Sequence, residues 1–109
     1  MKVVKLNAAL RSLRKINEEI RYASFFDEKH FSAGVIVFDP IDDSDRKAII
    51  HDDRDVLCHV LEGKGTLNCN GKRITLGPGT ICHIPKRTPH DFAAARSRQL
   101  VLFYSLIKS

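Results

Sequence analysis

The feature that most constrains this sequence is a succession of short apolar or alternating runs, separated by turn-forming residues, from residue 20 onward. Asn70-Gly71 is the clearest turn signal, since it lies between two alternating runs and both residues tolerate the positive φ that a two-residue hairpin needs. Many short strands separated by turns at intervals of about 8–12 residues are typical of an all-β sandwich or barrel. We therefore expect strands over the ranges 20–26, 32–39, 46–51, 55–61, 65–70, 72–76, 80–84, 90–94 and 99–106.

The residues before these runs predict one short amphipathic helix over 7–18. Asn7 is a suitable N-cap, and Leu10, Leu13 and Ile16 follow at the spacing of one helix face. Because basic residues occupy the other faces, we expect the apolar side to cover the core or to contact a second copy of the chain.

Length and composition exclude several classes of protein. The chain has 109 residues, the size of one domain, and its 43% hydrophobic and 28% charged residues are ordinary for a globular fold. No apolar run approaches the roughly 20 residues that span a bilayer. The first residues also lack the apolar segment of a secretory signal. We therefore expect no membrane partner and a cytoplasmic location.

The charge and the cysteines give no sign of a nucleic-acid partner or of a disulfide framework. The formal net charge is +5, but the basic residues form no arginine-rich run and no stripe interleaved with aromatic residues. Cys58, Cys69 and Cys82 form no Cys-x-x-Cys motif, so they are expected to be reduced thiols. None of them has a local signature of a catalytic nucleophile.

The stretch 55–92 resembles the cupin superfamily, in particular its small single-domain members. The second motif of that family runs from a glycine through Pro-x-Gly to a histidine and then an asparagine, and its spacing is kept here from Gly79 through Pro85 to His90. Arg87 stands where the family has its second glycine, and Ala94 stands where it has asparagine.

The first cupin motif is matched less completely. Gly63 corresponds to its closing glycine and His51 to its second histidine, whereas Ile49 occupies the position of the first histidine and Val56 that of the acidic ligand. Asp55 lies one residue before Val56. Because strand side chains alternate between faces, Asp55 reaches the interior only if a bulge shifts the register.

The resemblance implies a double-stranded β-helix, the jelly-roll barrel of the cupins, with a short N-terminal helix. It implies one cupin domain over residues 1–109, with a helical arm and first strand in 1–31 and the conserved barrel in 32–109. It also implies a homodimer, because cupins of this size commonly pair through an outer sheet face and an arm.

Cupin metal sites hold Fe, Mn, Ni or Zn between two or three imidazoles and a carboxylate, with a position open for substrate. The resemblance makes His51, His90 and Asp55 the candidate metal ligands, while Ile49 offers no donor atom. Whether a divalent transition metal is bound, and whether the protein is an enzyme, stays open at this point.

The candidate ligand pocket consists of the side chains that the resemblance places around the barrel cavity, with the facing of the last one left open: His51, His90, Ile49, Val56, Cys58 and His83. Apolar residues replace polar family residues at Ile49, Val56 and Ala94, which makes the cavity resemble a ligand pocket.

Two functions follow as hypotheses. The first is a binding module that holds a small polar or aromatic molecule in the barrel, with a degenerate metal site. The alternative is a mononuclear metal-dependent cupin enzyme, dioxygenase- or isomerase-like, that uses His51, Asp55 and His90.

Overall fold

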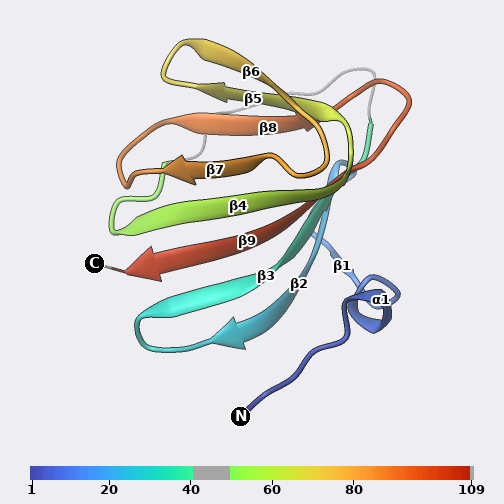
Figure 1. Cartoon of the computed structure of the whole chain (residues 1–109), viewed down its shortest axis with the longest axis vertical. Helices are drawn as coiled ribbons and strands as arrows, with labels where there is room; N and C mark the ends of the chain where they lie inside the picture. Colours follow the sequence, from blue (N-terminus) through green and yellow to red (C-terminus); the bar gives the residue numbers. More distant parts are fainter. Residues whose placement is uncertain (41–49, 109) are drawn as a thin grey trace.

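The structure is a computed structural model that describes residues 1–40 and 50–108. One short helix, α1, spans Leu6–Ala9, and strands make up most of the rest (Figure 1). The strands are β1 (Arg14–Lys15), β2 (Ile20–Asp27), β3 (Phe31–Phe38), β4 (Arg54–Gly63), β5 (Gly65–Cys69), β6 (Lys72–Leu76), β7 (Ile81–Ile84), β8 (His90–Ala94) and β9 (Leu100–Lys108). No helix among these residues is long and apolar enough to cross a membrane.

The strands form two antiparallel sheets, and in Figure 1 the strands of the smaller sheet lie at the top, next to β7 of the larger sheet. The larger sheet has the order β1-β2-β3-β9-β4-β7, and the smaller one has the order β6-β5-β8. The main core lies between them, since Leu67 and Leu76 of the small sheet belong to the same buried cluster as Leu100 and Leu102 of the large sheet. This two-layer architecture confirms the predicted all-β fold.

Alternation along β4 shows how the sequence specifies the two faces of the large sheet. Val56, Cys58 and Val60 are buried between the sheets, whereas Leu57 and His59 are exposed on the outer face. This period of two follows from the pleat of the strand, which turns successive side chains to opposite faces.

The predicted hairpin at Asn70-Gly71 is confirmed. Asn70 has a φ of 54° and Gly71 a φ of 80°, and the flanking residues Cys69 and Lys72 are paired in the ladder between β5 and β6. Two residues with positive φ match the twist of the strands that they connect.

The remaining expected strands agree with the observed ones to within two residues, apart from the range 46–51. Residues 46–49 of that range lie outside the described part of the chain, and residues 50 and 51 are not in a strand.

The prediction of a helix over 7–18 is wrong in extent. The helix ends at Ala9, and Arg14 and Lys15 instead pair with Tyr22 and Arg21 at the edge of the large sheet. Asn7 lies inside the helix, not at its N-cap. Edge pairing satisfies the backbone groups that a longer helix would have satisfied internally.

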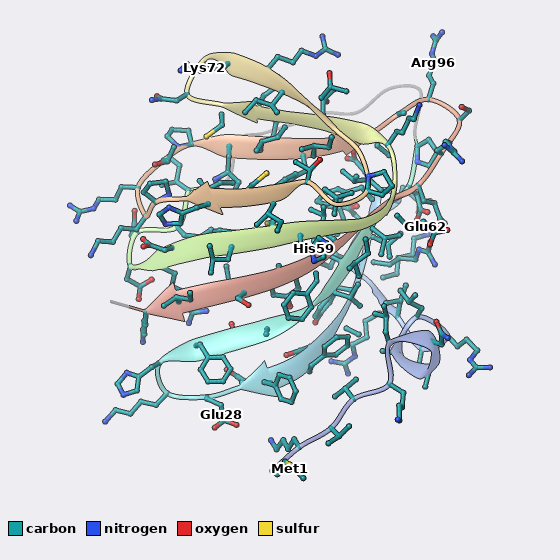
Figure 2. The ribbon with its side chains drawn as sticks, in the orientation of Figure 1. Met1, Glu28, His59, Glu62, Lys72 and Arg96 are labelled. Atoms are coloured by element: carbon teal, nitrogen blue, oxygen red, sulfur yellow. The ribbon has the colours of Figure 1, made fainter. Side chains whose placement is uncertain are left out.

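The apolar residues of this N-terminal segment still cover the sheet. Leu6, Leu10 and Leu13 pack on a second buried cluster on the outer face of the large sheet, which contains Val35 and Val37. The residues that precede α1 lead away from the sandwich to Met1 (Figures 1 and 2).

Candidate functional site

A cavity of about 230 Å³ lies on the inner face of the large sheet. Its wall is mainly apolar and aromatic, with Ile36 and Phe38 of β3, Phe92 of β8, and Leu102 and Leu106 of β9. These side chains alternate along their strands with residues that face outward, so the pleat of each strand supplies the wall at every second residue.

Two imidazoles stand together in this wall. The ring centroids of His51 and His90 are 5.6 Å apart, and the ring planes are inclined by 32°. His90 is the first residue of β8, and His51 lies in the segment that precedes β4. We call this part of the wall the histidine end of the cavity.

Each of these histidines is held by contacts with the turn between β7 and β8. The carbonyl oxygen of His51 accepts a hydrogen bond from the backbone N–H of Arg87 at 2.7 Å. Nδ1 of His90 lies 2.9 Å from the carbonyl oxygen of Thr88, and the ring meets Phe92 edge-on at 6.0 Å between centroids. His90 is only 4% exposed, so these contacts fix its ring within the core.

Burial lowers the pKa of His51, because removal from water disfavours the charged imidazolium. The positive charge of Arg54, and that of His90 when it is protonated, also lower the pKa of His51, whereas the negative charge of Asp53 raises it. Burial therefore favours the neutral form of the His51 ring.

Cys58 lines the same cavity as a protonated thiol. Burial raises the pKa of its thiol to about 12, so the thiolate is essentially absent at neutral pH. Cys82, its register partner on β7, also has a raised pKa because of burial. These thiols pack as small apolar side chains.

Asp55 and His83 are placed elsewhere. The Asp55 carboxylate accepts a hydrogen bond from the backbone N–H of Lys86 at 2.9 Å and lies 3.4 Å from Nε2 of His83. This pair is on the outer face of the large sheet, since Asp55 and Leu57 alternate with the buried Val56. His83 therefore does not line the cavity, and Asp55 does not join the two histidines, contrary to expectation. The reason is that successive side chains of β4 and β7 point to opposite faces of the sheet, and these two point outward.

Four of the other five predicted pocket residues line the cavity, and the fifth is not described by the structure. His51, His90, Val56 and Cys58 all contribute to the cavity wall. Ile49 lies outside the described residues.

Sequence reasoning missed two tyrosines in the wall, Tyr22 of β2 and Tyr104 of β9. A signal was present for Tyr104, because it lies two residues after the buried Leu102 and therefore on the same strand face. Burial raises the pKa of Tyr104, so its phenol stays protonated. A side chain at Gly34 would collide with the backbone of Ala23 and would come within 2.8 Å of the Tyr104 hydroxyl oxygen.

Comparison with known proteins agrees with this architecture. The cupin domain family, Cupin_2, matches residues 34–106, which is more than half of the chain. The chain belongs to the cupin family. A comparison with curated proteins finds no significant match.

Solved structures show the same fold across this cupin. A predicted oxalate decarboxylase from Thermotoga maritima superposes with a TM-score of 0.83 at 16% identity, covering 98% of this chain and 99% of that one. A protein from Thermus thermophilus gives a TM-score of 0.81 at 17% identity, covering 99% and 98%. The cupin domain of Cnp3 from Schizosaccharomyces pombe gives 0.78 at 16% identity, covering 90% and 69%. At these identities the likeness establishes the fold alone.

The residues of this cupin do not fit the metal-ligand set that the resemblance implied. Such a set needs three or four converging donors. The structure brings together His51 and His90, but the Asp55 carboxylate is bonded on the opposite face of the sheet. Within residues 1–40 and 50–108, no three His, Cys, Asp or Glu side chains are grouped so that they could hold an ion.

Proposed function

We propose that this cupin binds a small, largely apolar molecule in the cavity between its sheets. The observation that carries this proposal is the composition of the cavity wall: apolar and aromatic side chains, with the two imidazoles of His51 and His90 at one end. Ligand pockets have this character, with a few polar groups that orient the ligand against a hydrophobic surface.

The size of the cavity supports the same proposal. Its volume of about 230 Å³ exceeds the roughly 150 Å³ in which an engineered protein cavity holds benzene. A ring with one or two small substituents therefore fits. Desolvation of such a ring against Phe38, Phe92 and Leu102 would supply most of the binding free energy.

The metalloenzyme alternative has no comparable support. It requires the Asp55 carboxylate at the histidine end, whereas this carboxylate accepts a hydrogen bond from the Lys86 backbone and lies near His83. We therefore derive no reaction at this site.

The proposal is tested by titrating the labelled protein with 4-methylphenol and its methyl ether, 4-methylanisole, as probes. We expect saturable NMR shift changes in the methyl groups of Leu102 and Leu106, which line the cavity. An Ile36→Trp variant fills the cavity from β3 and should weaken binding at least about tenfold.

The matched control is Leu57→Trp, which adds the same ring on the outer face of β4, where Leu57 is exposed. This variant should bind both probes as the unmodified protein does. The proposal is overturned if neither probe shifts the cavity methyls, or if the two tryptophan variants affect binding equally.

A further inference from the structure

The described wall of the cavity contains no lysine, arginine, aspartate or glutamate. Its polar atoms come from the imidazoles of His51 and His90, the phenols of Tyr22 and Tyr104, and the thiol of Cys58. Arg54, whose charge acts on His51, lies 3.9 Å from the Asp53 carboxylate. Within the described wall, a charged ligand would therefore lose its hydration without meeting an opposite charge, which is costly.

The hydrogen bond of His90 determines which of its ring nitrogens carries the proton. Nδ1 lies 2.9 Å from the carbonyl oxygen of Thr88, and a carbonyl oxygen can only accept. Nδ1 is therefore the donor. In the neutral ring this leaves Nε2 with a lone pair, so Nε2 is a hydrogen-bond acceptor.

This acceptor has no protein partner among the residues that the structure describes. The hydrogen bond to Thr88 involves Nδ1, and the neighbouring rings of His51 and Phe92 are in ring-to-ring contact at 5.6 and 6.0 Å between centroids. In the described part of the chain, no side-chain nitrogen or oxygen is both fully enclosed and without a hydrogen bond. Nε2 of His90 is therefore accessible at the cavity wall.

We propose that the ligand of this cavity is an uncharged, ring-sized molecule with a hydroxyl or N–H group that donates a hydrogen bond to Nε2 of His90. The inference rests on the proposed function and deepens it by naming the chemical class of the ligand. A phenol is the simplest member of the class: its ring fills the apolar part of the cavity and its O–H satisfies the acceptor. A ligand without a donor leaves the acceptor of His90 desolvated and unpaired.

The decisive comparison is between 4-methylphenol and 4-methylanisole, which share a ring but differ in the donor. A third probe, 4-methylbenzoate, replaces the donor by a negative charge. Titrations are followed by NMR at about pH 8, above the ordinary imidazole range. We expect the phenol to bind at least about tenfold more tightly than the ether, and the benzoate to bind more weakly than both.

Two substitutions at His90 separate the acceptor from the shape of the site. His90→Phe keeps a ring but removes the acceptor, so it should abolish the preference for the phenol while the ether binds about as before. His90→Gln offers an amide oxygen that also accepts, so it should restore part of the preference. His83→Phe removes an imidazole from the outer face and should leave all affinities unchanged.

The outcomes distinguish this inference from the proposed function. If the phenol and the ether bind equally in the cavity, or if the benzoate binds best, the cavity is a ligand site but its chemical class is not the one inferred. If His90→Phe retains the preference for the phenol while its NMR spectrum stays that of the native fold, the role of Nε2 is overturned. If no probe reaches the cavity, both proposals fail.

Discussion

Arg87 donates its backbone N–H to the carbonyl oxygen of His51, and it does so from a left-handed backbone conformation with a φ of 64°. The hydrogen bond connects the turn between β7 and β8 to the segment that precedes β4, and it holds both sides of the histidine end together. The sequence has an arginine at the position where the cupin motif has glycine, which adopts this conformation without strain.

We expect Arg87→Gly to stabilise the protein. A side chain at a left-handed position costs about 1–2 kcal/mol. The greater freedom of glycine in the unfolded chain offsets part of the gain, so the net increase in unfolding free energy is on the order of 0.5–1 kcal/mol. Urea denaturation measures it. Arg87→Ala is the matched control, since it removes the guanidinium but keeps Cβ; an equal gain in that variant would contradict the explanation.

Asp39 gives a pH-dependent contribution to stability. Its carboxylate accepts hydrogen bonds from Nε and Nη2 of Arg21, both at 2.8 Å, and from the amide of Gln99 at 2.8 Å. The guanidinium of Arg21 lowers the pKa of Asp39 below the ordinary value of an aspartate. A lowered pKa in the folded state means that folding favours the ionised carboxylate. The stabilisation is therefore complete above pH 3.8 and is lost as the pH falls through the lower value of the folded state.

We therefore expect Asp39→Asn to lower the unfolding free energy by about 1 kcal/mol at pH 7, with a difference from the unmodified protein that shrinks toward zero in strong acid. Thermal unfolding of both proteins, measured from pH 7 down to strong acid, gives the difference. Glu18→Gln is the control, because Glu18 pairs with Lys15 at 3.0 Å at an exposed site and should contribute only about 0–0.5 kcal/mol. A difference between Asp39→Asn and the unmodified protein that persists undiminished below the folded pKa would contradict this account.

Metal ions should have little effect on stability. Two imidazoles without a carboxylate bind a divalent ion weakly, and weak binding at ordinary concentrations adds little to the unfolding free energy. We expect a chelator, or an excess of Mn, Fe, Ni or Zn, to change the melting temperature by no more than about 2 °C. A larger rise with one metal, abolished by His51→Phe, would show that the site binds that ion strongly.

The chain is predicted to form a homodimer through its N-terminal arm and the outer face of the large sheet. Val3 is 70% exposed and Ile81 is 73% exposed on these surfaces, so both have apolar area to bury. We expect light scattering at micromolar concentration to give twice the mass of the chain, and Ile81→Glu to shift it toward the monomer. Ile74→Glu, at an exposed position of the small sheet, should leave the mass unchanged. A monomeric mass for the unmodified chain would reject the prediction.

Local patterns predicted those parts of the fold that local physics determines. The hairpin at Asn70-Gly71 follows from two residues that accept positive φ, and the inward direction of Val56 and Cys58 follows from alternation. The approach of His51 to His90 comes from two motifs far apart in the sequence, and only the resemblance connected them.

The errors arose where tertiary structure overrides a local pattern. The leucines of the N-terminal segment have helical spacing, yet Arg14 and Lys15 pair with the edge strand β2, and the helix ends early. The outward facing of His83 follows from its alternation with Cys82 and the buried Ile84, but the short run 81–84 does not show by itself which of its two faces is buried. The tyrosines were missed because tyrosine is intermediate between the mostly buried and the mostly exposed residue types, so its identity alone does not indicate a face of the strand.

Gly34 and Tyr104 are register partners on β3 and β9, and the missing side chain of Gly34 leaves space beside the Tyr104 hydroxyl in the cavity wall. One absent carbon atom on β3 gives the phenol room to lie against the strand. Any other amino acid there would place a Cβ atom against the backbone oxygen of Ala23 and close to the Tyr104 hydroxyl oxygen, so strand β2 or the phenol would have to shift. The position of a phenol in the cavity wall therefore depends on a residue that contributes no side chain at all.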